Sequence, residues 1–228
     1  SEDGRLLRRY AGGEAALPGT LEDYAFFVQG LLDLFEASSD PAWLRESARL
    51  TKVMTDDLED KESGGFYFTA EAEPARLKES YDGPTPSGNS VAALDLIRLS
   101  ELTGDQEYRK RAERTLRAFG KEVERRPSAH ACMLAALDLL LNGTREVVVT
   151  APDEQLARPM KDEVFRTFAP DRVLLTATTA TYPALTKLST LLEGREPAAR
   201  PRAYVCQNFA CKVPAATVKT LSSQLTAR

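Results

Sequence analysis

Two carboxylates and a group of aromatic side chains stand together at the start of one predicted helix. Glu22 and Asp23 are followed at once by Tyr24, Phe26 and Phe27. A carboxyl group in a pocket can act as a general acid or base, and aromatic walls beside it suit sugar rings. The structural alternative is that acids in a first helical turn offset the helix macrodipole, by about 0.3–1 kcal/mol each. The chemical hypothesis makes Glu22 and Asp23 catalytic and Tyr24 ligand-binding.

The densest polar stretch of the chain covers residues 81–90, with the sequence Tyr-Asp-Gly-Pro-Thr-Pro-Ser-Gly-Asn-Ser. A loop that enters a helix explains part of it, with Ser87 as the N-cap and two prolines that stiffen the approach. That explanation does not require Tyr81, Asp82 or Asn89. The N–H groups of a helix start point outward, where an oxyanion or a sugar hydroxyl can bind. The chemical hypothesis therefore adds Asp82 as a catalytic residue and, as ligand-binding residues, Lys78, Tyr81, Ser87 and Asn89.

His130 is the only histidine of the chain. It ends the phrase Pro127-Ser128-Ala129-His130, which parallels Pro86-Ser87-Gly88-Asn89 and places His130 at another helix start. A helix N-terminus disfavours the imidazolium, so the position suits a neutral histidine that exchanges hydrogen bonds with a ligand. The alternative is a histidine with a purely structural role.

Cys206 and Cys211 are separated by four residues, unlike the C-x-x-C of redox helices and zinc knuckles. The pair is either redox-active or half of a metal site, or else Cys206 is simply a buried strand residue. No second Cys or His pair lies nearby, so we expect no metal. Cys132, in an apolar helix, is expected in the core. Three cysteines, an odd number, argue against a disulfide scaffold and favour a reducing, cytoplasmic setting.

An internal repeat must position these residues. Residues 31–43, shifted by 65, fall without a gap on residues 96–108. Each copy has the pattern of a helix, a tight turn and a helix, which predicts stacked helical hairpins. The short turns of such hairpins lie at one end and the long connection 59–86 at the other. The starts of the first, third and fifth helices should therefore gather with that connection on one rim, where sites tend to lie.

The chain is predicted to be mainly α, with helical hairpins over residues 1–142 and a small α/β part over residues 143–228. Alternating strands and helices in the second part predict parallel strands. In the first part a strand-like stub at residues 5–10 is followed by a loop to residue 20, and residues 64–68 form a turn and a short strand. The expected helices are 21–37, 41–58, 87–103, 106–124, 127–141, 153–168, 183–192 and 214–226, and the later strands 145–150, 172–176 and 203–206.

Composition narrows the classes of function. The chain has 43% apolar and 28% charged residues and a net charge of −4, without the basic face that a nucleic-acid partner requires. No apolar stretch approaches the roughly 18–20 residues that span a membrane. Phosphate loops, serine-nucleophile elbows and dinucleotide glycine motifs are absent, so no cofactor is expected. A start at Ser1 rather than methionine favours a fragment of a longer protein.

Four phrases together resemble one family: Leu-Glu-Asp-Tyr-Ala-Phe at 21–26, Gly-Gly-Phe-Tyr-Phe at 64–68, Asp-Gly with Pro-Ser-Gly-Asn-Ser within 82–90, and Ala-Tyr-Val-Cys-Gln-Asn-Phe-Ala-Cys at 203–211. Over nearly its whole length the chain resembles the C-terminal part of the YyaL-type thioredoxin-domain proteins, which include a spermatogenesis-associated member in animals. The resemblance implies a larger parent with an N-terminal thioredoxin-like domain. It also implies an (α/α) toroid similar to six-hairpin glycosidases and N-acylglucosamine 2-epimerases, of which this chain would hold about half. It carries over no catalytic residue, because the family has no established activity.

Two functional hypotheses follow. In the first, the toroid rim binds a carbohydrate-like or other small polar ligand, with acid/base chemistry by carboxylates. A glycosidase needs two carboxylates about 5–10 Å apart, which Glu22 or Asp23 could form with Asp82. An epimerase uses paired histidines, and His130 has no second histidine beside it in this sequence. In the second hypothesis, the chain is a non-catalytic scaffold that positions the thioredoxin-like domain and its partners.

Overall fold

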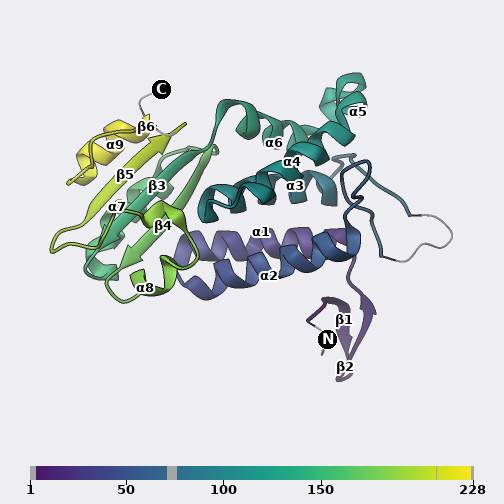
Figure 1. The fold of residues 1–228 in the computed structure, drawn as a ribbon, viewed down its shortest axis with the longest axis horizontal. Coiled ribbons are helices and arrows are strands. Elements are labelled where there is room, and N and C mark those ends of the chain that lie inside the picture. Colours follow the sequence, from purple (N-terminus) through teal and green to yellow (C-terminus); the bar gives the residue numbers. More distant parts are fainter. Residues whose placement is uncertain (1–3, 71–75, 209, 227–228) are drawn as a thin grey trace.

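A computed structural model describes residues 4–70, 76–208 and 210–226 (Figure 1). Within the predicted motifs, residues 71–75 of the long connection and Phe209 of the cysteine phrase lie outside the described residues. The described chain is mainly helical, with a small sheet that follows the helices. The helices of the first part end at Asn142 and the sheet begins at Arg145.

The repeat forms two helical hairpins whose turns use the same hydrogen bonds. Ser38 and Thr103, one repeat apart, each donate a 2.6 Å hydrogen bond to the carbonyl four residues earlier. Asp40 and Asp105 each accept, at 2.9 Å, the N–H two residues later and so cap the second helix of their hairpin. The four helices are α1 (Leu21–Ser38), α2 (Pro41–Leu58), α3 (Gly88–Thr103) and α4 (Gln106–Ala118), with bounds close to the prediction except at the end of α4.

The two hairpins stack with α1 beside α3 (Figure 1). Arg98 of α3 donates hydrogen bonds to Asp33 at 2.8 Å and to Glu36 at 2.9 Å. Asp33 is the position in α1 that the 65-residue repeat pairs with Arg98. Glu36 is buried and also accepts from Arg172 of the sheet at 3.0 Å. Because Glu36 of α1 forms ion pairs with Arg98 of α3 and Arg172 of the sheet, it links the two hairpins to the sheet.

The helical part departs from the prediction after residue 118. The expected helix 106–124 breaks at Phe119, whose ring packs in the core, and continues as α5 (Gly120–Arg125). The expected helix from Pro127 is a 3₁₀ turn (Pro127–Ala129) followed by α6 (Ala131–Asn142). Proline disfavours helical backbone in the residue before it, so the chain cannot run straight from α5 into α6.

The sheet contains β3 (Arg145–Ala151), β4 (Arg172–Thr178), β5 (Arg202–Gln207) and β6 (Ala210–Cys211) in the order β4-β3-β5-β6. β3 and β4 are parallel, as predicted, but β5 is antiparallel to β3, so the prediction of parallel strands was wrong there. The reason lies in the expected helix 183–192, which is only one turn, α8 (Tyr182–Leu185), and a 3₁₀ turn (Thr190–Leu192). A parallel β5 would need a crossover that returns the chain to the end of the sheet where β3 begins, usually through a longer helix, and this segment contains none.

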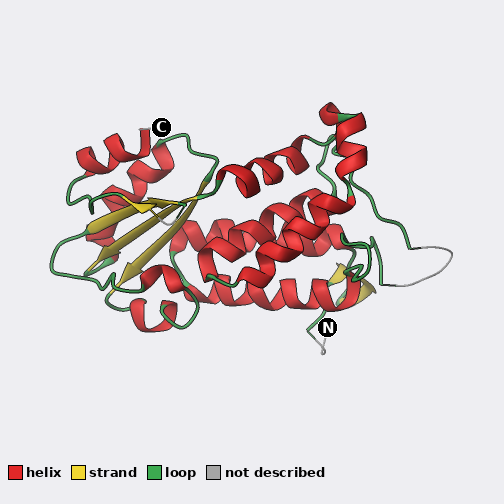
Figure 2. Ribbon diagram, turned by 45° about the horizontal axis from the view of Figure 1, so that its top comes forward, coloured by secondary structure: helices red, strands yellow, loops and turns green. Residues whose placement is uncertain are grey.

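Apolar residues cover both faces of the sheet. α7 (Glu154–Arg166) and α9 (Val218–Thr226) pack on one face, over Val147, Val149 and Val205. The other face, with Val148 and Val173, joins the core of α1 and α3. Figure 2 shows the sheet between these two helical layers. The helical array and one face of the sheet therefore share one core, and α7 and α9 form a second core on the opposite face.

The N-terminal residues form a hairpin of β1 (Leu7–Ala11) and β2 (Glu14–Pro18) instead of one strand and a loop. Gly12 and Gly13 make its two-residue turn with φ of 61° and 84°. Both values favour glycine, and the pair has the sequence of a tight hairpin turn. The strand expected at 64–68 is only a single bridge between Glu59 and Phe66.

One buried carboxyl makes a testable contribution to stability. Asp95, near the middle of α3, is buried, and neither of its oxygens has a hydrogen-bond partner within the described chain. Burial raises the pKa of Asp95 well above its usual range. The folded state therefore favours the protonated form, and Asp95 destabilises it increasingly as the pH rises above the unfolded pKa of about 4. We expect Asp95→Asn to raise the unfolding free energy at pH 7 by about 1 kcal/mol or more.

Denaturation by urea at several pH values checks this expectation. The gain should shrink toward zero below about pH 3, where Asp95 is protonated in both states. Asp138→Asn, at an exposed position of α6, serves as the control and should show no such trend. A gain of the same size at pH 4 and pH 7 would contradict it.

Candidate functional site

The starts of α1, α3 and α6 meet the α2–α3 connection at one end of the helical array (Figure 1). The N–H of Leu21 donates to the carbonyl of Phe68 at 2.9 Å. At the start of α3, a Cβ built on Gly88 would lie only 2.8 Å from Cγ of Leu21, so the close approach of the two helix starts requires glycine. The residues that the sequence assigns to the rim thus lie on neighbouring elements.

Of the acids at the start of α1, Asp23 is part of the helix cap. Its Oδ2 accepts from both the N–H and the hydroxyl of Thr20, the N-cap residue, each at 2.8 Å. Arg8 lies 3.9 Å from the same oxygen. Glu22 is half-buried against Gly88, and its carboxylate makes no hydrogen bond within the residues that the structure describes. Glu22 is therefore the more available of the two carboxylates.

Asp82 connects the starts of two helices. Its Oδ1 accepts the N–H of Ser87 at 2.9 Å, at the N-cap of α3. Its Oδ2 accepts the N–H groups of Cys132 and Met133 at 2.8 and 3.1 Å, in the first turn of α6. His130, the N-cap residue of α6, supplies no side-chain cap, so Asp82 takes that role from a distant part of the chain. The Asp82 carboxylate, which the sequence suggested as catalytic, thus accepts hydrogen bonds from three backbone N–H groups.

Asn89 and Ser87 are likewise used inside the fold. Asn89 is completely buried; its Oδ1 accepts the N–H of Phe66 at 2.7 Å, and its Nδ2 donates to the carbonyls of Phe66 and Glu79 at 2.9 Å each. Ser87 caps α3 through a 3.2 Å hydrogen bond from the N–H of Ser90. The side chain of Asn89 therefore binds two segments of the long connection in place of a ligand.

Lys78 and Tyr24 also face protein groups. Lys78 Nζ donates to Asp60 Oδ2 at 2.7 Å and to the carbonyl of Gly64 at 3.1 Å. The Lys78 ammonium, the N–H of Ser63 and the Tyr67 hydroxyl hold the pKa of Asp60 well below its usual range. Tyr24 is buried, and its hydroxyl accepts the N–H of Leu6 at 3.0 Å.

His130 and Tyr81 lie at a hollowed part of the rim. His130 is buried, with Nδ1 2.9 Å from the carbonyl of Arg126 and Nε2 3.1 Å from Oγ of Ser80. A carbonyl only accepts, so Nδ1 carries a proton, and in the neutral ring Nε2 accepts from the serine. Tyr81 is exposed. Both residues line an open cavity of about 550 Å³, together with Glu122, Arg125, Arg126 and Ala129.

A second cavity, absent from the sequence prediction, lies where the far end of α3 meets the sheet. Its volume is about 520 Å³, and Cys206 and Cys211 lie on its wall. The two cysteines, which the sequence left open between a redox pair, half of a metal site and a buried strand position, are joined by a disulfide across the β5–β6 hairpin. The charged residues that line this cavity are Glu101, Arg109, Glu146, Glu193 and Arg195.

Two carboxyl groups of this second cavity are perturbed by their surroundings. Burial raises the pKa of Glu146, although Arg195 opposes the rise. Burial and the nearby Glu146 raise the pKa of Glu101, which Arg109 counteracts from 3.2 Å. Glu101 is the repeat equivalent of Glu36, so the sequence marks it as a repeated position. The repeat alone does not tell whether such a glutamate lines a site or forms an ion pair.

Two further observations bear on the classes of function. Among residues 4–70, 76–208 and 210–226, no group of three His, Cys, Asp or Glu side chains is placed to hold a metal ion. No helix in the described part of the chain is long and apolar enough to cross a membrane.

Comparison with known proteins places the chain beside one set of relatives. No protein-family model matches it. It is 38% identical over 230 aligned residues to the human protein named spermatogenesis-associated protein 20, and 36% and 35% identical to the rat and mouse proteins of that name. Each alignment covers 92% of this chain but only 28–29% of the relative. The chain is thus similar to one segment of these much longer proteins and spans less than a third of their length.

Proposed function

We propose that this chain serves a longer protein as a structural module, without catalysis at the rim of its helical array. Its helical array packs through its open sides against other parts of the parent and so positions them, including the thioredoxin-like domain that the sequence resemblance implies. The observation that carries this proposal is that two helices of the array, α1 and α6, both expose large apolar side chains.

The exposed face of α1 is a stripe rather than a single side chain. Phe27 is 50% exposed and Leu34 is 48% exposed. Gly30 lies between them at spacings of three and four, and a Cβ there would meet nothing within 4 Å. Residues with this spacing share one helix face, so this stripe of α1 is apolar and uncovered within the described residues.

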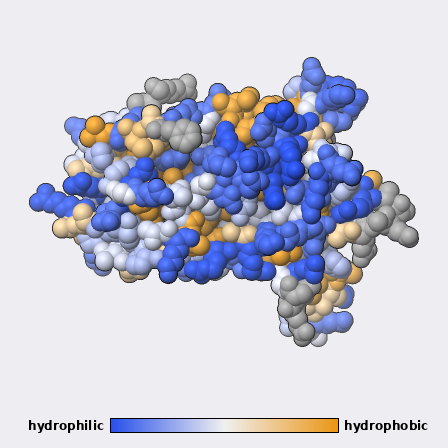
Figure 3. Space-filling model, in the orientation of Figure 1, coloured by the Kyte–Doolittle hydropathy of each residue, from blue (hydrophilic) through white to orange (hydrophobic). Residues whose placement is uncertain are grey.

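The exposed face of α6 is the second open side. Leu141 is 72% exposed. A mostly apolar groove of about 250 Å³ lies where α6 meets α4 and α5, lined among others by Leu116, Val123, Met133 and Leu137. Figure 3 shows an apolar patch over α6 on an otherwise largely hydrophilic face.

These two faces have the character of internal surfaces. In stacked helical repeats, each unit buries its apolar face on its neighbour, and the end units need polar outer faces to remain in water. Contiguous apolar patches on a surface mark contacts with other protein segments. The use of Asp23, Asp82 and Asn89 as internal hydrogen-bond partners agrees with a rim built for stability.

A binding measurement tests the proposal. The remainder of the parent protein, expressed as a separate polypeptide, should bind this chain, and Leu34→Glu should weaken the affinity at least about tenfold because it puts a charge into an apolar contact. The matched control is Leu156→Glu on α7, where the leucine is 45% exposed but lies outside the array. Equal affinities for the unmodified chain and Leu34→Glu, or no binding at all, would count against the proposal.

The rim cavity beside His130 favours a second candidate function, the binding of a small polar or sugar-like ligand. Its supporting observation is that Tyr81 offers an exposed ring next to Glu122, Arg125 and Arg126, which together supply stacking and hydrogen bonding. Glu122 is the acid that lines this cavity, and Glu22 lies elsewhere on the rim, against Gly88. A thermal-shift screen of sugars with the unmodified chain and Tyr81→Ala tests this candidate, which fails if no sugar gives a shift that depends on Tyr81.

A further inference from the structure

The disulfide between Cys206 and Cys211 has one sheltered and one accessible end. Cys206, in β5, is 2% exposed, whereas Cys211, in β6, is exposed. Thiol–disulfide exchange requires a thiolate to approach one sulfur in line with the bond, so access decides which sulfur is attacked. An incoming thiol can reach Cys211 and leaves Cys206 as the departing sulfur.

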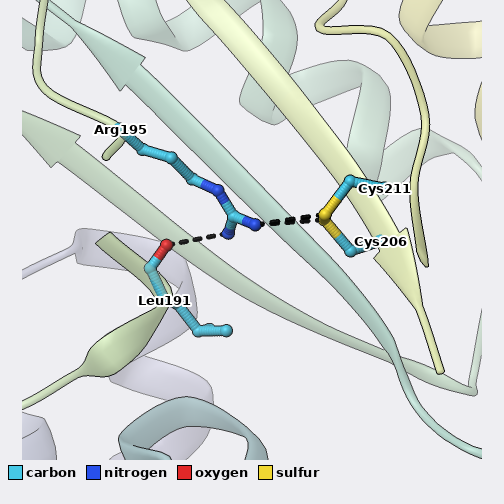
Figure 4. The surroundings of a disulfide bond; sticks show 4 residues. All are labelled: Leu191, Arg195, Cys206 and Cys211. Carbon is cyan, nitrogen blue, oxygen red and sulfur yellow. Dashed lines mark hydrogen bonds between the residues drawn. A yellow bond between two sulfur atoms is a disulfide. The ribbon is translucent and has the colours of Figure 1, made fainter. Parts of the chain in front are cut away.

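Arg195 places a cation on the sulfur atoms. Its Nη2 lies 3.2 Å from Sγ of Cys206 and 3.3 Å from Sγ of Cys211 (Figure 4). Its Nη1 donates to the carbonyl of Leu191 at 2.8 Å, and its guanidinium carbon lies 5.3 Å from the centre of the Tyr204 ring. These two anchors hold the guanidinium in place. A neutral disulfide gains little from a cation, but a thiolate is strongly stabilised by one.

The cavity beside the disulfide contains a carboxyl group that can exchange a proton. Glu146 of β3 is the direct cross-strand partner of Cys206, and directly paired residues of an antiparallel sheet point to the same face. Its carboxyl is partly buried in the cavity that the disulfide also lines. Burial keeps such a group more readily protonated than an exposed glutamate, which is the property of a proton donor near neutral pH.

We propose that Cys206 and Cys211 form a thiol–disulfide exchange site for a protein dithiol, with Arg195 stabilising the Cys206 thiolate and Glu146 supplying its proton. This activity is separate from the scaffold role proposed above and does not depend on it.

The exchange proceeds in two balanced steps. A thiolate of the dithiol attacks Sγ of Cys211 and forms a mixed disulfide, and the electron pair of the broken bond goes to Sγ of Cys206. The second sulfur of the dithiol, as a thiolate, then attacks the dithiol sulfur of the mixed disulfide and releases Cys211 as a thiolate. The dithiol has lost two electrons and become a disulfide. Its two protons end on Cys206, through Glu146, and on Cys211, through solvent.

Thiol counting and reduction kinetics test the proposal. Without reductant the unfolded chain should show one free thiol, Cys132, and after full reduction three. The native disulfide should be reduced by dithiothreitol and by millimolar glutathione without denaturant. Arg195→Gln should slow reduction by about three- to tenfold, because the leaving thiolate is less stabilised. Titration of the reduced chain by ultraviolet absorbance should show one thiolate forming well below pH 8.5, and the variant should lose it.

Matched variants separate this role from a structural one. Arg195→Lys keeps the charge and should recover part of the rate, whereas Arg109→Gln, in the same cavity but away from the sulfurs, should leave it unchanged. Glu146→Gln should flatten the pH dependence of reduction around neutrality. A disulfide that resists glutathione in the native chain, or reduction rates that are equal in Arg195→Gln and the unmodified chain, would overturn the proposal.

Discussion

Replacing Asn89 with alanine is expected to lower the unfolding free energy by about 3–5 kcal/mol. The change removes three hydrogen bonds at once and leaves the N–H and carbonyl of the buried Phe66, and the carbonyl of the more exposed Glu79, without their partner. Each buried backbone group left unpaired costs about 1–3 kcal/mol. The loss approaches the whole stability of an ordinary domain, so urea denaturation should show a large shift of the midpoint.

Asn142→Ala is the matched control for this substitution. Asn142 is an exposed asparagine at the end of α6, and its side chain makes one hydrogen bond, to Asp138 at 2.7 Å. Its loss should cost no more than about 0.5 kcal/mol. If Asn89→Ala costs as little as the control, the side chain does not hold the connection to α3, and a ligand-binding role for Asn89 becomes the better hypothesis.

Replacing Asp82 with alanine is expected to cost about 2–4 kcal/mol and to loosen the start of α6. The variant leaves the N–H groups of Ser87, Cys132 and Met133 without their acceptor. Cys132 and Met133 belong to the first turn of α6, whose N-cap residue supplies no side-chain cap. Hydrogen exchange should speed up at the start of α6, and denaturation should report the loss of stability.

Asp153→Ala provides the comparison for Asp82. Asp153 caps α7 through a single hydrogen bond from the N–H of Leu156 at 2.9 Å, so its loss should cost about 1 kcal/mol. An Asp82→Ala chain with unchanged stability and unchanged exchange in α6 would show that the carboxylate is free for other work. Acid/base catalysis by Asp82 at the rim would then be the better hypothesis.

The helical hairpins could be read from the sequence because their signals are local. Helix caps such as Asp40, Ser87 and Asp105 and the 65-residue repeat act within a few residues or within one hairpin. The gathering of three helix starts at one end follows from the lengths of the turns alone. By contrast, the direction of β5 depends on how the segment before it packs, which no local pattern records.

The candidate sites show a similar division. The sequence placed the polar rim residues close together, but whether Asp82 or Asn89 faces a ligand or the backbone depends on contacts with residues up to 51 positions away. The cavity beside the disulfide joins α3, β3 and β5, and Arg195 reaches the sulfurs from an irregular segment. Such a site combines residues that have no common motif, so only the fold reveals it.

Thiol labelling of a cysteine placed at position 34 tests the central claim most directly. In the isolated chain, Leu34→Cys lies on the uncovered stripe of α1 and should react quickly with a maleimide, whereas burial raises the pKa of the native Cys132 to about 11 and keeps it unreactive. In the full-length parent protein the same cysteine should react at least about tenfold more slowly, because the proposal has that stripe covered by another part of the parent. Equal labelling rates in the isolated chain and in the full-length protein would contradict the scaffold account.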